Sequence, residues 1–580
     1  MQARRFRPTT GALRACAGCG GALVALLAVA RPAAAQVTGT NVACAGQEVS
    51  EIQISTKPPY YPKNGKWWET PLGILASLHV DTKPDVIRRF LLLQPGMPCD
   101  EQRRAESERI LRAQPFIADA TIRAFDDGRG GVILSVLTTD ELTPIVGATT
   151  SGKRPYVTSL KLGEGNLLGT GRLVSAQWGS GELRDTYGAH ITDYQFFGRP
   201  WMLDLVAIRQ DAGIGGWSVD VSHPYLTDQQ RIAWRVSAGD RRDLFDFLRG
   251  DLEPVTVGID RHFSDIGGVV RVGAPGRLSL FGLSFSSESD TPGLPPVLDP
   301  SIPYDSLLQR FGRRRNARVN LLWGVRSIGF RRARHFDALT AYQDVRVGFQ
   351  LGTLIGRSLS VLGTRDDDLL LAGDLYAGVG GPHTFMSLQA AAEGRQDYDA
   401  NSWDGIIGSA HIALYHQLGT HHTLVSNFDW GGGWKQRIPL QLRLGQIEGG
   451  VRGYRDSRDA GAIRAVARLE DRWYLGKIRD QAAVGLALFT DAGRLWAGDV
   501  PYGVSTPVKV GAGIGLLAAL PPGSRRTWRV DVAFPLSPDG HARWEVRLWT
   551  MNAAHLFERE PRDLRFSRER VVPSSVFQWP

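Results

Sequence analysis

The segment TWRVDVAF (residues 527–534) places a large apolar side chain at every second position, with Arg529, Asp531 and Ala533 between them. The segment RWEVRLWT (543–550) repeats this pattern. A period of two puts alternate side chains on opposite faces of a β-strand. These segments therefore predict strands that have one apolar face and one charged face.

Short strands and Gly-rich turns of the same kind continue over residues 141–551. We count about twenty strand candidates there, many about ten residues long, the length that a tilted strand needs to cross a bilayer. Several carry aromatic residues near their ends, as membrane barrels do at both interfaces. We therefore predict a mainly β fold with a transmembrane antiparallel β-barrel whose apolar face meets lipid. The alternative is a periplasmic β-protein whose apolar face is inside.

The N-terminus has the features of a cleaved secretory signal. Residues 1–35 begin with a basic segment, continue with the apolar run ALVALLAVA (22–30) and end with three alanines. Such a run is too short to span a bilayer as a helix and fits a signal peptide. We therefore expect an exported chain in which residues 36–44 form a short linker.

Of the 4 cysteines, Cys44 and Cys99 remain once the signal has been removed. Two thiols in an oxidising compartment can form a disulfide, and two free thiols are the alternative. A metal or redox pair would need closer spacing and a nearby histidine. The sequence therefore predicts no metal site.

The formal net charge of +9 is compatible with nucleic acid or with an acidic surface as a partner. The densest basic cluster, RFGRRRNAR (310–318), has no aromatic interleaving and follows no nucleic-acid-binding pattern. We interpret it as a solvated loop or as a contact with lipid headgroups at a membrane rim. Outer-membrane lipid is thus an expected partner, whereas nucleic acid is not.

Residues 45–140 combine strand and helix patterns in the order strand, helix, helix, strand, strand. Asp100 stands where it can cap the N-terminus of the second helix. The last two strands are joined by the turn DDGRGG, which predicts a hairpin. The five segments are EVSEIQIS (48–55), KPDVIRRFLLL (83–93), CDEQRRAESERILRAQ (99–114), FIADATIRAF (116–125) and GVILSVLTT (131–139).

A Gly-rich loop, IEGGVRGYRDSRDAG (447–461), places Arg452 and Tyr454 beside glycines. Strand parity in the segments that follow puts Glu470 and Asp491 on the polar, inward-facing side of neighbouring strands. An arginine folded into the barrel could bind both acids through its planar guanidinium. The alternative is an extracellular loop with solvated arginines, and spacing alone does not decide between the two.

Several motifs together resemble the outer-membrane assembly-barrel superfamily, which includes the Bam and Tam barrels and the two-partner secretion translocators. Residues 45–140 resemble one polypeptide-transport-associated (POTRA) domain of that superfamily. The barrel motifs are VRGY (451–454), LEDRW (469–473), FTDAGRLW (489–496), the turn GEGNLLGTG (163–171) and the penultimate strand VDVAFPL (530–536).

The resemblance implies a surface antigen of the Gram-negative cell envelope. It consists of a signal peptide (1–35), a POTRA-like periplasmic domain (45–140), an outer-membrane barrel of about sixteen strands (141–551) and a C-terminal extension (552–580). The resemblance also implies a loop lock in which Arg452, flanked by Gly453 and Tyr454, is held by Asp491 and by Glu470 as a second partner. The barrel-motif residues that it singles out are Asn166, Gly169, Gly171 and Gly493.

The implied function is insertion, assembly or translocation of client proteins, which are unfolded outer-membrane or secreted proteins. An extended client could add as a strand to the POTRA sheet, and the seam would lie between strands at about 143–151 and 543–550. Periplasmic proteins are further expected partners. One alternative is a two-partner-type secretion pore for one cognate protein, and another is a passive structural or porin-like barrel.

The chain departs from the family pattern in two places. Only one POTRA-like domain fits before the barrel, which puts in doubt any equivalence to a central assembly machine. Residues 552–580 follow the last strand, either as a periplasmic extension or because the last strand lies elsewhere. No nucleophile elbow and no phosphate-binding loop are present in the sequence, so neither an enzyme nor a cofactor is expected.

Overall fold

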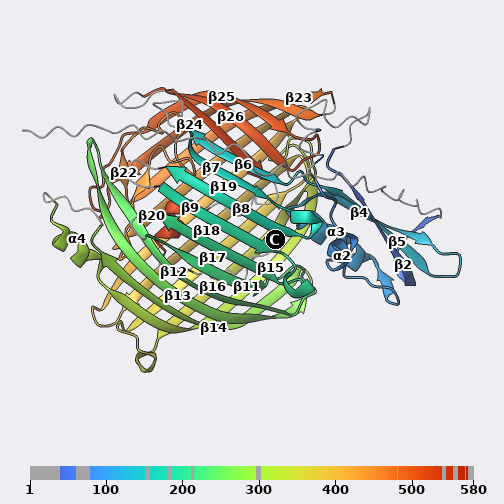
Figure 1. Cartoon of the computed structure of the whole chain (residues 1–580), viewed down its shortest axis with the longest axis horizontal. Coiled ribbons are helices and arrows are strands. Elements are labelled where there is room, and N and C mark those ends of the chain that lie inside the picture. Colours follow the sequence, from blue (N-terminus) through green and yellow to red (C-terminus); the bar gives the residue numbers. More distant parts are fainter. Residues whose placement is uncertain are drawn as a thin grey trace, which may run out of the picture. The chain divides into compact units, whose positions relative to one another are not determined.

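The protein is described from a computed structural model that covers residues 40–60, 73, 77, 79–150, 157–180, 185–210, 214–295, 302–479, 481–537, 544–552, 560–568 and 570–571. The predicted signal peptide lies outside the described residues. The fold is mainly β, with a small N-terminal sheet and a large antiparallel sheet (Figure 1). In the described part of the chain, no helix has the length and apolar character needed to cross a membrane.

The N-terminal sheet has the strand order β1-β4-β5-β2-β3, in which β2 and β5 are parallel. Its helix α3 begins as predicted, because the Asp100 Oδ1 accepts a hydrogen bond of 2.8 Å from the backbone N–H of Arg103. The elements are β1 (Asn41–Val42), β2 (Ala45–Lys57), α2 (Pro84–Arg88), β3 (Pro98–Asp100), α3 (Glu101–Ala113), β4 (Ile117–Asp126) and β5 (Val132–Asp140).

Two features at the start of this sheet concern the sequence predictions. Residues 36–44 were expected to be a linker, but β1 lies within them and pairs with Phe125 and Ala124 of β4, so that prediction is wrong for β1. Cys44 and Cys99 form the predicted disulfide. The bond joins the start of β2 to β3, and both sulfurs belong to the buried core of the sheet.

The large sheet has twenty strands, and consecutive strands pair antiparallel. In the strand order β27 lies next to β6, so the sheet closes into a barrel. The strands are β6 (Pro144–Thr150), β7 (Val157–Glu164), β8 (Arg172–Ser180), β9 (Asp185–Asp193), β10 (Met202–Gln210), β11 (Ile214–His223), β12 (Ile232–Arg249), β13 (Leu252–Ala274), β14 (Arg277–Gly293), β15 (Arg314–Ala333), β16 (Gln343–Ser358), β17 (Asp368–Gly380), β18 (Thr384–Asp397), β19 (Ser402–Leu418), β20 (His422–Trp434), β23 (Ile463–Ile478), β24 (Ala482–Trp496), β25 (Lys509–Ala519), β26 (Arg526–Pro535) and β27 (Glu545–Asn552).

The strand count differs from the number that the resemblance implied. About sixteen strands were expected, whereas the described residues alone contain twenty strands of this sheet. The motifs that carry the resemblance lie near the first strand and in the last third of the chain, so they do not fix the number of hairpins between. Direct counting of alternating segments gave the better value.

The polarity of the strands follows the predicted parity. In β26, Arg529 and Asp531 are almost fully buried, while Phe534 on the other face is 50% exposed. In β27, Glu545 and Arg547 are buried, while Leu548 is 55% exposed. The charged faces therefore point into the space that the sheet encloses, which we call the lumen, and the apolar faces point outward.

Smaller elements complete the described structure. The short strands β21 (Leu442–Arg443) and β22 (Ala460–Gly461) pair with each other and flank the loop that contains Arg452. Helices α4 (Tyr304–Phe311) and α5 (Arg562–Phe566) precede β15 and follow β27, respectively. Single turns of 3₁₀-helix lie at Leu167–Gly169, Phe196–Gly198 and Ser360–Leu362.

Replacing both Cys44 and Cys99 by alanine is expected to lower the free energy of unfolding of the N-terminal sheet by about 2–4 kcal/mol, because the disulfide closes a long loop in the unfolded chain. The measurement is the urea dependence of trypsin cleavage within α3 in the full-length protein. Reducing agent should lower the urea midpoint of cleavage of the natural protein to that of the variant, and it should not change the midpoint of the variant. Equal midpoints without reducing agent would contradict the prediction.

Candidate functional site

Arg452 lies in the lumen, on the loop between β21 and β22. Its Nε and Nη2 donate hydrogen bonds of 2.8 and 2.7 Å to the two carboxylate oxygens of Asp491 on β24. Its Nη1 lies 3.3 Å from Glu470 Oε2 and 3.2 Å from Asp531 Oδ2. The structure thus brings together Arg452, Glu470 and Asp491, the three residues that the family resemblance joined in a loop lock, and adds Asp531.

Two further arginines extend this ion network. Arg529 donates from Nη1 and Nη2 to both oxygens of Glu470, at 2.5 and 2.7 Å, and from Nε to Asp531 at 2.6 Å. Arg472 donates to Glu470 at 2.5 Å and to Asp337 at 3.1 Å. Each of these buried guanidinium groups therefore contacts at least two carboxylates, which offsets the cost of removing the charges from water.

Gly453 and Tyr454 fix the loop to the last strands of the barrel. The Gly453 N–H donates a hydrogen bond of 2.9 Å to Glu545 Oε2, and its φ of +92° suits glycine. The Tyr454 hydroxyl lies 2.8 Å from the carbonyl oxygen of Ser537 and 3.0 Å from that of Val510. Tyr454 is completely buried, so the loop is packed into the lumen and not extended into solvent.

The strand β24 is shaped to receive this loop. A Cβ atom at Gly493 would lie 2.5 Å from Val451 Cγ2, so a larger residue there would push the loop away. The ring of Phe489 lies under the guanidinium, with the Arg452 Cζ 3.4 Å from the ring centroid. Together with Asp491, these residues make β24 the main counter-surface of Arg452.

The residues around this site also match a known protein family. Residues 370–546 match the model of the Omp85 superfamily domain, and this range includes Arg452, Glu470, Asp491 and Asp531. The chain carries an Omp85 superfamily domain. The family match indicates an outer-membrane protein, and it confirms the family resemblance that the sequence motifs gave.

Solved structures of low sequence identity resemble the chain. BamA from Haemophilus ducreyi lacking POTRA domains 1–3 is 12% identical, with 87% of this chain and 85% of that chain covered and a TM-score of 0.35. CdiB from Acinetobacter baumannii is 11% identical, with 86% and 73% covered and a TM-score of 0.39. CdiB from Escherichia coli is 13% identical, with 87% and 76% covered and a TM-score of 0.38. No curated protein sequence matches the chain.

Sequence reasoning missed several members of the network in the Omp85 domain and before it. Arg529 and Asp531 lie on the polar face of TWRVDVAF, and Glu545 lies on the polar face of RWEVRLWT, so parity placed them in the lumen without assigning them partners. Asp337 lies in the turn between β15 and β16, where no periodicity indicates its direction. Contacts of that kind could not be read from the sequence.

The turn motif GEGNLLGTG (163–171) contacts residues 81–82 of the N-terminal region. The Asn166 side chain accepts a hydrogen bond of 2.8 Å from the Gly171 N–H and donates one of 2.8 Å to Thr82 Oγ1. Gly169 has a φ of +67°, and a Cβ there would meet the carbonyl oxygen of Asp81. Asn166, Gly169 and Gly171 thus form a contact between two parts of the chain.

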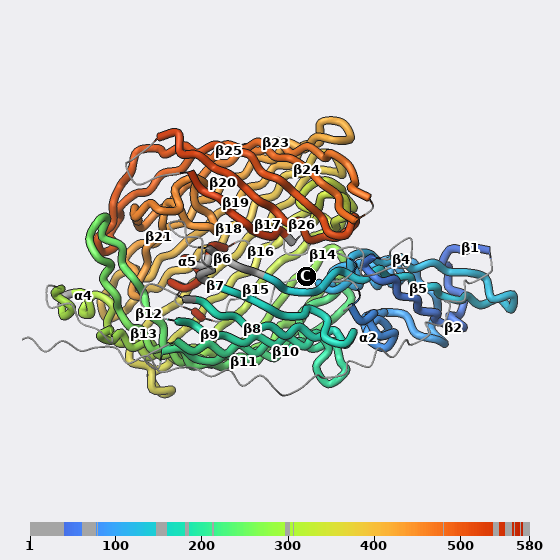
Figure 2. Tube along the Cα trace, turned by 45° about the horizontal axis from the view of Figure 1, so that its top comes forward, coloured from blue at the N-terminus to red at the C-terminus, as the bar shows by residue number. Residues whose placement is uncertain are grey.

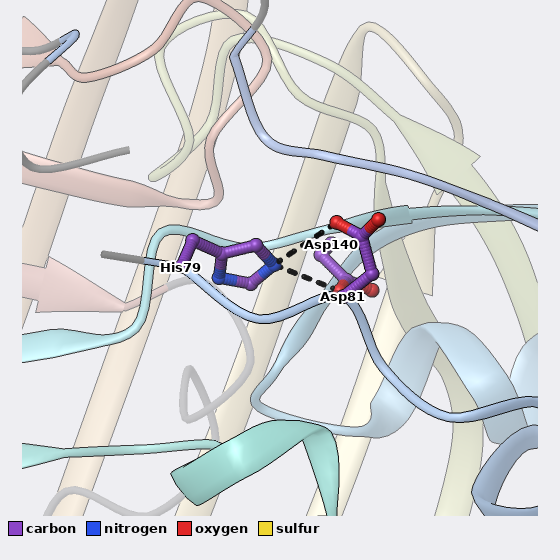
Figure 3. A group of neighbouring side chains, drawn as sticks. All are labelled: His79, Asp81 and Asp140. Carbon is purple, nitrogen blue, oxygen red and sulfur yellow. Dashed lines mark hydrogen bonds and ion pairs between the residues drawn. The ribbon is translucent and has the colours of Figure 1, made fainter. Parts of the chain in front are cut away.

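His79, Asp81 and Asp140 form a cluster close to this turn (Figure 3). The His79 Nε2 lies 2.9 Å from Asp140 Oδ2 and 3.9 Å from Asp81 Oδ1. Asp140 also accepts hydrogen bonds from the Thr82 N–H and hydroxyl, at 2.7 and 2.8 Å. Burial raises the pKa of the Asp140 carboxyl, against the opposite effect of these hydrogen bonds. These contacts give the cluster a role in joining β5 to residues 79–82.

The basic cluster 310–318 requires a correction. It was interpreted as a solvated loop or a headgroup contact, but Arg314 and Arg318 are almost fully buried on the lumen face of β15. Arg314 Nη2 lies 2.5 Å from Asp290, and Arg318 Nη2 lies 2.7 Å from Asp368. The alternation of a strand could not be recognised in this run, because its inward-facing residues are basic or polar like most of their neighbours.

Replacing Arg452 by alanine is expected to destabilise the barrel by about 3–5 kcal/mol, because it leaves buried carboxylates without their main partner. The measurement is the temperature at which the folded form disappears in heat-modifiable gel migration, together with trypsin cleavage of the loop 447–461. Adding Asp491→Asn should recover part of the loss, since it removes the unpaired charge.

The matched control for this prediction is Arg494→Ala. Arg494 lies on the same strand as Asp491 but is exposed on the outer face. This variant should keep the transition temperature and the loop protection of the natural protein. If Arg452→Ala and Arg494→Ala behave alike, the lock does not stabilise the barrel.

Proposed function

We propose that this chain spans the outer membrane as a barrel and assists the insertion of unfolded outer-membrane proteins. Residues 45–140 act as a POTRA-like domain in the periplasm, and the client enters the membrane at the seam between β6 and β27. The observation that carries the proposal is the length of the strands around the barrel. Over the residues that the structure describes, they become shorter toward this seam from both sides.

The described parts of the two seam strands are among the shortest in the barrel. β6 has 7 residues and β27 has 8, whereas β13 has 23 and β15 has 20. At about 3.3 Å per residue and a tilt of about 40°, eight residues cover about 20 Å of the hydrocarbon core of about 30 Å. A seam of this length would favour a thinner bilayer beside it and would place few ladder hydrogen bonds between β6 and β27.

The loop lock supports this function by holding one side of the seam in place. Arg452 contacts Asp531 on β26, and Gly453 contacts Glu545 on β27. The last two strands are thus tied to the lumen loop, whereas β6 begins only four residues after β5 ends. A seam with one tethered side and one side attached to the periplasmic domain can open without loss of the remaining barrel.

The N-terminal sheet offers one edge for an extended client. The outer edge of β4 is covered by α3, because Arg104 donates to the Ile122 carbonyl oxygen and Glu108 accepts from the Ile122 N–H. On the other side, β3 pairs only with the start of β2, and no strand among the described residues pairs with the free edge of residues 50–57. We infer that a client adds to β2.

A disulfide across the seam is expected to stop client insertion. Val146→Cys combined with a cysteine at Val546 or Leu548 places both thiols on the outer face, where all three natural side chains are exposed. Oxidation should lower the insertion of an unfolded outer-membrane protein into liposomes about tenfold or more, because the client can no longer pair with open strand edges. Reductant should restore insertion.

The matched control is a disulfide between Ile232→Cys and Val270→Cys, which are direct partners on β12 and β13 far from the seam along the strand order. This pair should leave insertion unchanged in both redox states. Continued insertion with a locked seam would refute the proposal. Export of one cognate protein through a locked barrel would favour the two-partner-type pore, and ion conductance without any client defect would favour a passive barrel.

The β2 edge gives a separate prediction. A photo-crosslinking residue at Gln53 on β2 is expected to capture an unfolded client during assembly several-fold more often than one at Thr121 on β4, whose edge α3 covers. The yield of crosslinked client on gels is the measurement. Equal yields at the two positions would show that client capture does not use the free edge of β2.

A further inference from the structure

The C-terminal segment after the last strand enters the lumen. Residues 552–580 were expected to be a periplasmic extension, or else to show that the last strand lies elsewhere. The last strand is β27 (Glu545–Asn552), and the described residues 560–568 and 570–571 lie against the inner wall, with α5 inside the ring of strands (Figure 2). The expectation of a periplasmic extension is therefore wrong for this part.

Arginine side chains of the segment pair with lumen acids. Arg570 Nη2 lies 2.5 Å from Asp265 Oδ2 on β13, and both side chains are almost fully buried. Arg568 Nη1 lies 3.1 Å from Glu393 Oε2 on β18. Charge-assisted contacts of this kind orient a peptide as well as hold it.

The wall also binds the backbone of the segment. Arg261 on β13 donates from Nη1 to the Phe566 carbonyl oxygen at 2.7 Å and from Nη2 to the Arg568 carbonyl oxygen at 3.0 Å. The Ser567 hydroxyl donates to the Pro439 carbonyl oxygen at 2.7 Å. The two contacts of Arg261 go to backbone oxygens at the end of α5 and just after it, so they do not depend on the side chains of the segment, whereas the Ser567 contact does.

Apolar contacts fix the depth of the segment. Leu564 is 1% exposed in a cluster with Ile407, Leu440 and Val500. A Cβ at Gly431 would lie 2.5 Å from Leu564 Cδ1, so a larger residue there would have to displace the end of the leucine side chain. Phe566 stacks on Phe245 with 5.6 Å between the ring centroids.

We propose that this wall is a binding site for an arginine-bearing polypeptide segment, and that residues 560–571 are its resident, displaceable ligand. The site consists of Arg261, Asp265, Glu393 and the pocket for Leu564. The segment plugs the lumen when no client is present, and a client segment with the same chemistry replaces it. The client part of the proposal rests on the proposed insertion function, whereas peptide binding does not.

The segment is well placed to act as a competitor. It is joined to β27 through residues 553–559, so a short linker keeps it close to the wall at a high effective concentration. A peptide added from solution must compete with it. Removal of the tail should therefore raise the apparent affinity of the wall for a peptide of the same sequence.

The test uses a chain that ends after Asn552 and a fluorescent peptide with the sequence of residues 560–571. Fluorescence anisotropy should show saturable binding to the shortened chain and binding to the full chain that is weaker by about 100-fold or more. A peptide with Arg568→Glu and Arg570→Glu should bind about 100-fold more weakly than the natural one, because two buried ion pairs are lost. Absence of binding to the shortened chain, or equal binding to both chains, would overturn the proposal.

A charge exchange separates specific binding from misfolding. The shortened chain with Asp265→Arg should lose the natural peptide and bind a peptide with Arg570→Asp. Its heat-modifiable gel migration reports that the barrel is folded. If the exchanged pair does not recover binding in a folded barrel, Asp265 is not part of the site.

Client insertion by the shortened chain, measured with and without the peptide, separates the peptide-binding inference from the proposed insertion function. The natural peptide should slow client insertion by the shortened chain, in parallel with its binding. Binding without any insertion activity would refute the insertion function and leave the peptide site standing. Insertion that is unaffected by saturating peptide would refute the claim that a client segment takes the same wall.

Discussion

The ion network around Arg452 is the interaction on which the last third of the barrel depends. Moving a charged side chain out of water costs several kcal/mol, and the cost is offset only when each charge has close partners of opposite sign. Here Glu470, Asp491 and Asp531 come from three different strands and meet arginines from a loop and two strands. A shift of one residue in any of these strands would turn its carboxylate outward and leave an arginine without that partner. The network therefore fixes strand register as well as loop position.

This dependence explains why strand parity was the most informative part of the sequence. A period of two, read with the charged face inward, placed Glu470 and Asp491 correctly and put Arg529, Asp531, Glu545 and Arg547 on the lumen side. The pairing of Arg452 with Asp491 needed one further step, because a Gly-rich loop has no parity. The resemblance to a known family supplied that step.

Other features could not be predicted, for physical reasons that differ from case to case. Asp337 reaches Arg472 from a turn, whose direction is set by the tertiary fold alone. Strand β1 has two residues, too few for any period, and it forms because Phe125 and Ala124 offer an unpaired edge. The tail carries arginines at irregular spacing, which in isolation is typical of a solvated segment. Acids on β13 and β18, remote in sequence, together with Glu560 in the tail, give those arginines partners in the lumen.

The loop that carries Arg452 contacts the C-terminal segment 560–571, and this contact limits how far each of them can move independently. A Cβ at Gly449 in the loop would lie 3.3 Å from Pro561 in the tail, and Gln446 Nε2 lies 3.2 Å from Asp563 Oδ1. Departure of the tail would therefore uncover one end of the loop while Arg452 still held its centre to β24. Because the strands next to the seam take their register from Arg452 and not from the tail, the lumen can be vacated without disordering β26 and β27. The proposed insertion function would need this separation between the segment that leaves the lumen and the loop that keeps the strands in register.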